Sequence, residues 1–120
     1  MILKLNNDDQ LELKYSFRSS IYFETISGHN LDLQNLTGND LVTLFYAVFV
    51  ASLQKEGKPI IDMLSFLNIV DDNGGDKALL EFSQWYVNQI KLQWDLEDEP
   101  EEEKVSKEKN RTYASKKKLS

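Results

Sequence analysis

The amino-acid sequence predicts an α+β fold that is mainly α, with an N-terminal β-hairpin, about four helices and a disordered, charged C-terminal tail. Three observations lead to this prediction. Apolar residues alternate with polar ones near the N-terminus, recur every three or four positions in later segments, and become rare in the last quarter of the chain. Because 120 residues suit a single domain, we expect one domain over residues 1–96, hairpin included, and a tail over residues 97–120.

The hairpin prediction depends on two short apolar runs on either side of a polar turn. The turn is the Asn-Asn-Asp-Asp run at residues 6–9, whose side chains favour turns. The apolar residues are Ile2, Leu3 and Leu5 before the turn and Leu11, Leu13 and Tyr15 after it. Because two strands alone are marginally stable in water, we expect this hairpin to pack its apolar face on the helices.

The first two helices are expected over residues 18–26 and 38–56. Ser16 is a candidate N-cap for the first, and Gly28 is its expected stop. The spacing of Thr37 and Asp40 predicts a capping box at the start of the second. Apolar residues cover nearly all sides of the second helix, so we expect it to lie at the centre of the domain or in an interface.

The last two helices are expected over residues 59–70 and 76–94. Pro59 suits a first helical turn, and Asp76 is the expected N-cap of the final helix. The aromatic residues of the second and final helices favour a core position, with a protein–protein contact as the alternative. They are Phe45, Phe49, Trp85 and Trp94.

Composition excludes several kinds of chemistry. The chain has no cysteine, which excludes disulfides, thiol catalysis and thiolate metal sites and favours a reducing cytoplasm. The single histidine, His29, is expected in an exposed loop. Four scattered carboxylates each have a surface or capping role to fill: Glu24, Asp32, Asp40 and Asp62. We therefore expect no enzyme activity, no catalytic residue, no metal site and no cofactor.

Charge and hydropathy also exclude classes of partner. A net charge of -6 and a pI near 4.8 oppose binding to nucleic acid, which depends on Lys and Arg. The longest apolar stretch, residues 41–53, is too short to cross a bilayer, so we expect no membrane span. The run at residues 71–76 lacks the glycine and glutamate positions of a calcium loop and is expected to be an ordinary turn.

The expected tail has the composition of a disordered segment. Residues 97–120 hold seven acidic and seven basic side chains and few large apolar ones. Such a segment cannot bury enough apolar surface to offset the entropy of ordering it. It is expected to solubilise the chain, with specific binding as the alternative.

The order of these elements resembles the tail assembly chaperones of siphophages, especially those that infect Gram-positive hosts. The segments that carry the resemblance are residues 18–31, RSSIYFETISGHNL, residues 40–47, DLVTLFYA, and residues 78–82, ALLEF. They follow a short β start and precede an aromatic close. The resemblance covers roughly residues 10–95.

This resemblance implies a function in the host cytoplasm. A chaperone of this type binds the tape measure protein, keeps it soluble while tail tube subunits assemble, associates with itself, and is absent from the mature virion. In many members a ribosomal frameshift appends a domain that recruits the tail tube protein. The lysines at residues 116–118 suit a slippery codon run, or they are plain charge.

The family transfers no contact residues, so the interface candidates are apolar positions that a partner could reach. They are Tyr46, Phe49, Leu53 and Trp94. Two other functions stay open. One is a small phage or bacterial adaptor or inhibitor that acts by protein–protein binding, and the other is a structural subunit of the virion. Exchange of the hairpin between subunits and an acidic monomer are both compatible with the sequence.

Overall fold

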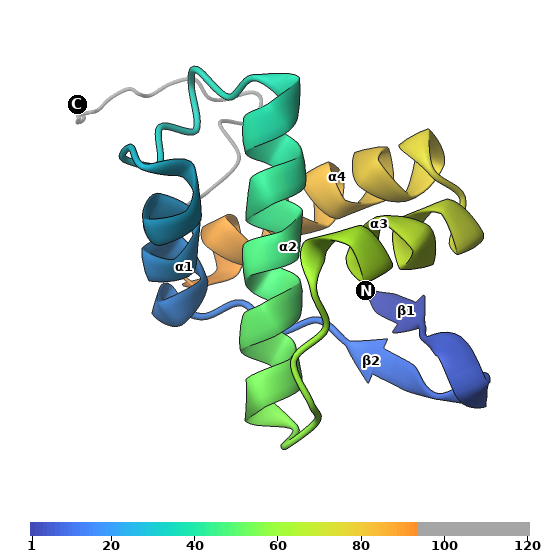
Figure 1. The fold of residues 1–120 in the computed structure, drawn as a ribbon. Helices are drawn as coiled ribbons and strands as arrows, with labels where there is room; N and C mark the ends of the chain where they lie inside the picture. Colours follow the sequence, from blue (N-terminus) through green and yellow to red (C-terminus); the bar gives the residue numbers. More distant parts are fainter. Residues whose placement is uncertain (94–120) are drawn as a thin grey trace, which may run out of the picture. The chain divides into compact units, whose positions relative to one another are not determined.

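The computed structural model describes residues 1–93 of the chain. Its elements in order are β1 (Ile2–Lys4), the 3-10 helix η1 (Asn6–Asp8), β2 (Gln10–Glu12), α1 (Phe17–Ser27), α2 (Gly38–Lys55), α3 (Met63–Asp72) and α4 (Asp76–Gln93) (Figure 1). The α+β, mainly α prediction is therefore confirmed. The predicted disordered tail and Trp94 lie outside the described residues.

The chain forms two units, and the boundary falls within α4. Residues Met1–Val87 make one compact unit. The second unit begins at Asn88, and the structure describes only its first six residues, the end of α4. The boundary expected near residue 96 lies outside the described residues.

The hairpin forms as predicted and turns its leucines inward. Strands β1 and β2 pair antiparallel with Leu3 opposite Leu11. Leu3, Leu11 and Leu13 are all buried, while the strand residues between them are exposed. This alternation places one apolar face of the hairpin in the core.

Two polar side chains fasten the hairpin to the helices. The Asn73 side chain accepts a hydrogen bond from the Lys4 backbone N–H at 3.0 Å and donates one to the Lys4 carbonyl at 2.9 Å. This pair of bonds occupies the outer edge of β1 much as a neighbouring strand would. At the end of β2, the Lys14 backbone N–H donates to the Ser52 Oγ in α2 at 2.9 Å.

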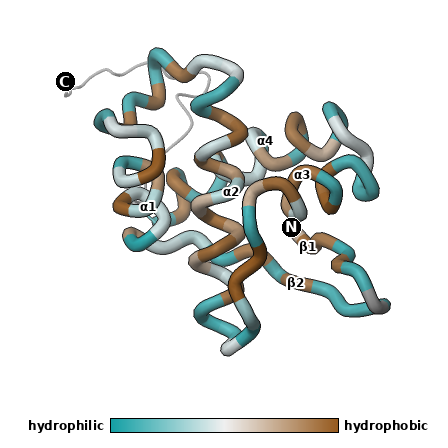
Figure 2. The backbone as a smooth tube through the Cα atoms, viewed as in Figure 1, coloured by the Kyte–Doolittle hydropathy of each residue, from teal (hydrophilic) through white to brown (hydrophobic). Residues whose placement is uncertain are grey.

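Helix α2 begins at the predicted capping box and lies at the centre of the core. The Thr37 hydroxyl accepts from the Asp40 N–H at 3.0 Å, and the Asp40 carboxylate accepts from the Thr37 N–H at 3.3 Å. Eight residues of α2 are buried. Figure 2 shows hydrophobic segments along α2 and in the connection from α2 to α3.

Stacked aromatic rings connect α2 with α3 and α4. The Phe45 ring lies parallel to that of Phe82 with centroids 4.4 Å apart, and it meets the Phe66 ring edge-on at 5.1 Å. Phe49 also contacts Phe66, at 4.8 Å. All four rings are fully buried, so the predicted core role of Phe45 and Phe49 is confirmed.

One predicted helix start and two predicted capping roles need correction. Helix α3 begins at Met63, not Pro59, because the Asp62 carboxylate caps it by accepting from the Ser65 N–H at 2.8 Å. Asp76 lies inside α4 and is not its N-cap. Ser16 does occupy the N-cap position of α1, but its side chain makes no capping bond.

Among residues 1–93, no helix is both long enough and apolar enough to cross a membrane.

Candidate protein-binding surface

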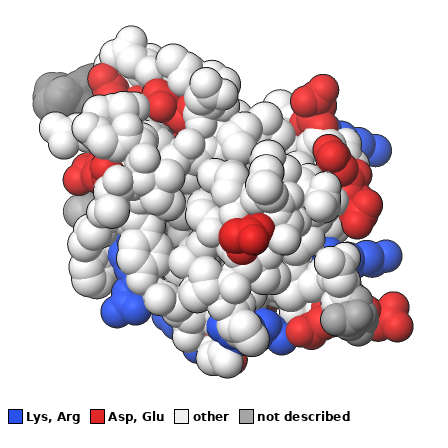
Figure 3. Space-filling model, in the orientation of Figure 1, with Lys and Arg blue, Asp and Glu red and all other residues white. Residues whose placement is uncertain are grey.

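Long stretches of α2 and α3 carry no charge. Residues 41–54, nearly all of α2, contain no acidic or basic side chain. Between Lys58 and Asp71 the only charged residue is Asp62. Figure 3 shows the result: a broad face over α2 and the start of α3 is almost free of charged groups, with one acidic side chain in its middle.

Large apolar side chains are exposed within this region. Leu64 is 76% exposed, Ile60 53% and Leu67 38%. Beside them on α2, Val42 and Tyr46 are half-buried. We call these five residues the uncharged face. Contiguous exposed apolar surface on a soluble protein typically marks a site of interaction.

Tyr46 connects α2 to the segment that leads into α3. Its hydroxyl donates to the Ile61 carbonyl at 2.7 Å, and its ring meets Phe66 at 5.2 Å. Partial burial, with a smaller effect from Asp62, raises the pKa of Tyr46 above its ordinary value of 10.0. This predicted interface residue therefore belongs to the uncharged face, and its contact with a partner stays a prediction.

Two other predicted interface residues are not exposed. Phe49 and Leu53 are fully buried within their own chain. They face inward because α2 has neighbours on several sides, which cover these two residues while Val42 and Tyr46 stay half-buried. The fourth candidate, Trp94, lies outside the described residues.

The exposed leucines of α3 were missed by sequence reasoning. Helix α3 buries only Phe66 and Ile69, and Leu64 and Leu67 extend its apolar residues beyond that stripe. A short helix with apolar residues on several sides cannot bury all of them against one neighbour. That pattern is the signal that would have identified Leu64 as exposed.

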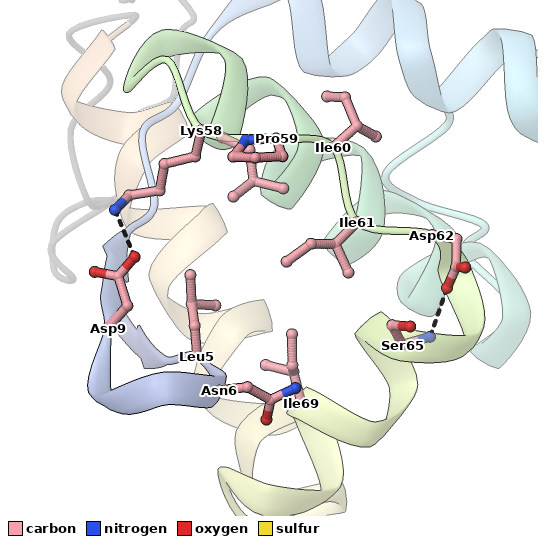
Figure 4. Close-up of a pocket in the computed structure, with 11 residues that line it drawn as sticks. Leu5, Asn6, Asp9, Lys58, Pro59, Ile60, Ile61, Asp62, Ser65 and Ile69 are labelled. Carbon is pink, nitrogen blue, oxygen red and sulfur yellow. Dashed lines mark hydrogen bonds and ion pairs between the residues drawn. The ribbon is translucent and has the colours of Figure 1, made fainter.

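A hollow of about 440 Å³ adjoins this face between the hairpin turn, the α2–α3 connection and α3. Figure 4 shows Leu5, Ile61 and Ile69 on its apolar walls. At its rim the Lys58 ammonium pairs with the Asp9 carboxylate at 2.8 Å. Their hydrogen bond lowers the pKa of Asp9 and raises that of Lys58.

A second hollow of about 270 Å³ lies between α2, α3 and α4. Its apolar lining includes Val42 and Leu67 from the uncharged face together with Val70 and Leu79, and its polar lining includes Asp71 and Asp76. Both hollows therefore open beside residues that belong to the uncharged face or adjoin it.

Two titratable groups elsewhere, His29 and Asp40, contact each other. His29 is 53% exposed in its side chain, as predicted, and its Nε2 lies 3.0 Å from an Asp40 oxygen. Its contact with the Asn30 carbonyl, and secondarily with Asp40, raises the pKa of His29. The hydrogen bond with the Thr37 backbone lowers the pKa of Asp40.

Asp32 and Glu24 also fill the expected local roles. Asp32 accepts from the Gln34 N–H at 3.0 Å, and Glu24 accepts from the Leu31 N–H at 3.4 Å. Within the described part of the chain, no three His, Asp or Glu residues gather as a metal site would require. The uncharged face can bury the apolar surface of a partner.

Comparison of the chain with protein-family models, curated proteins and solved structures gives no match.

Proposed function

We propose that this chain is a non-enzymatic tail assembly chaperone of a long-tailed phage that binds the tape measure protein through the uncharged face. It acts in the host cytoplasm and leaves before the virion is complete. The observation that carries the proposal is the exposure of Ile60, Leu64 and Leu67 on a surface almost free of charge. The resemblance in element order supplies the identity of the partner.

The physical argument is that an extended apolar helix aggregates unless its apolar stripe is covered. Burying apolar surface contributes roughly 25 cal/mol per Å², so a face with several exposed leucines and isoleucines can compensate for the loss of freedom on binding. Side chains on α2 and α3 are already positioned for this contact. The folded chain thus offers the groove-and-helix mode of recognition that amphipathic helices use.

The test is co-expression with the tape measure protein encoded by the same genome, followed by a solubility assay and a pull-down. The original chain should keep the partner soluble and co-elute with it. The Leu64→Asp variant should lose both effects, because a carboxylate in the contact would lose its hydration on binding.

Phe17→Asp is the matched control. Phe17 is 75% exposed in the first turn of α1, and Leu64 is 76% exposed in the first turn of α3. Both substitutions remove a large exposed apolar group and place an acid at a helix N-terminus, where it is well tolerated. If the original chain is folded yet leaves the partner insoluble and unbound, the chaperone proposal is wrong and the adaptor or inhibitor hypothesis takes its place.

A further inference from the structure

We propose that the partner segment is a basic amphipathic helix: one bulky apolar side chain enters the hollow between α2, α3 and α4, and flanking Lys or Arg side chains meet Asp71 and Asp76. This inference rests on the proposed function and adds the chemistry of the bound segment. It is carried by the charge distribution, by the placement of two acids in α3 and by the size of the hollow.

Most of the protein's net negative charge lies in α3, in most of α4 and in the segment that leads into α3. Residues 59–90 hold five acidic residues and one basic residue, Lys77, a net charge of -4 out of -6 for the whole chain. Figure 3 shows acidic side chains grouped at the end of the molecule where α3 meets α4. A segment that binds there gains from positive charge and is opposed by negative charge.

Two of these acids occupy positions that do not favour the helix that carries them. Asp71 and Asp72 lie at the C-terminal end of α3, which has no basic residue in its last turn. Negative charge at a helix C-terminus is unfavourable because the exposed carbonyls are themselves negative. Within residues 1–93 neither carboxylate forms an ion pair. The stability of α3 therefore does not account for them.

The hollow itself has the dimensions of an anchor site. Its volume of about 270 Å³ falls below the range of roughly 300–1,000 Å³ typical of small-molecule pockets and suits one large side chain. Val42, Leu67, Val70 and Leu79 supply apolar contacts, and Asp71 and Asp76 lie in the same lining. An apolar anchor flanked by cations matches both parts of this lining.

The larger hollow provides a contrast. Its lining holds two carboxylates, Asp9 and Asp62, but also Lys58, which pairs with Asp9 at 2.8 Å. The lining of the smaller hollow holds Asp71 and Asp76 and no basic residue, so it attracts an added cation more strongly. Charge complementarity therefore assigns the basic segment to the hollow between α2, α3 and α4.

The test uses two synthetic helical peptides with the same apolar stripe, one flanked by lysines and one by glutamates, titrated into the full chain and followed by fluorescence anisotropy. The lysine peptide should bind more tightly, and its advantage should shrink as salt is raised. Asp71→Asn should weaken the lysine peptide about two- to fivefold, as expected for one partly exposed ion pair.

Three further variants and readouts separate this role from a structural one. Glu12→Gln, which removes the same charge from β2, should leave affinity for the lysine peptide unchanged. Leu67→Gln should weaken both peptides together, because it removes an apolar wall. Asp71→Asn should also leave Tm unchanged or raise it, because the acid opposes its own helix.

Equal affinity for the two peptides, or an unchanged lysine-peptide affinity in Asp71→Asn, would overturn the inference. The inference would also be overturned if the chain forms a dimer that binds neither peptide and that Asp71→Asn does not disrupt. The face would then bind a second copy of the chain. If the tape measure protein is kept soluble but the two peptides bind equally well, this inference alone is refuted. Peptide selectivity without any rescue of the tape measure protein refutes the proposed function alone.

Discussion

Replacing Ser52 with alanine should loosen the attachment of the hairpin to α2. Ser52 is fully buried, accepts a hydrogen bond from the Lys14 backbone N–H at 2.9 Å and donates one to the Val48 carbonyl at 2.7 Å. The Val48 carbonyl keeps its helical bond in the variant. The Lys14 N–H loses its partner in a partly buried position and becomes the source of the destabilisation.

The magnitude follows from two opposing effects. Leaving a buried donor unsatisfied costs about 1–3 kcal/mol. Alanine is a better helix former than serine by roughly 0.5 kcal/mol, which offsets part of that loss. The expected net destabilisation is about 1–2 kcal/mol, and each kcal/mol lowers Tm by about 4–8 °C in a domain of this size.

Ser83→Ala is the matched control because Ser83 lies in α4 and its hydroxyl bonds only to the Leu80 carbonyl in the preceding turn. It gains the same helix propensity without leaving a donor unpaired. Both variants would be unfolded in urea and followed by far-ultraviolet circular dichroism, with amide exchange measured at Lys14. If Ser52→Ala is as stable as Ser83→Ala and the Lys14 amide stays protected, the hydrogen bond from the Lys14 N–H to Ser52 does not hold the hairpin to α2.

Three further predictions concern the core, the loop histidine and the cap of α2. Phe45→Ala should cost about 3–5 kcal/mol in urea unfolding, because it empties the space beside the stacked Phe82 ring; a cost under about 1 kcal/mol would contradict that packing. The folded-state pKa of His29 is raised, so its stabilising contribution is present at low pH and is lost as pH rises above 6.5 through that raised value. His29→Gln should flatten the pH dependence of Tm there, and an unchanged profile would refute the contacts of His29 with the Asn30 carbonyl and Asp40. Thr37→Ala should cost about 1 kcal/mol by removing the acceptor for the Asp40 N–H, while equal Tm values would show that the capping box contributes nothing.

Local signals in the sequence predicted the elements well where residues a few positions apart decide the structure. The capping box of α2 needs only Thr37 and Asp40, three residues apart, and it forms as expected. The hairpin likewise depends on alternation within fifteen residues. The start of α3 was mispredicted because two signals compete within four residues, and the capping carboxylate of Asp62 prevails over Pro59.

The surface could not be predicted from the sequence, because it depends on contacts between distant residues. Helical spacing shows that Phe49 and Leu53 are on apolar stripes, but it does not show which stripes are covered by neighbouring elements. The Asn73 side chain bonds to Lys4, 69 residues away. Both hollows are likewise lined by elements far apart in the chain, so their acids and leucines come together only in the folded structure.

The most direct test of the uncharged face is backbone amide exchange of the chain, free and in complex with the co-expressed tape measure protein. Binding through this face should slow exchange at the start of α3 and in the connection before it, around Ile60 and Leu64, and leave the start of α1 around Phe17 unchanged. Protection confined to α1 or the hairpin, with α3 unaffected, would contradict the account and place the binding surface elsewhere.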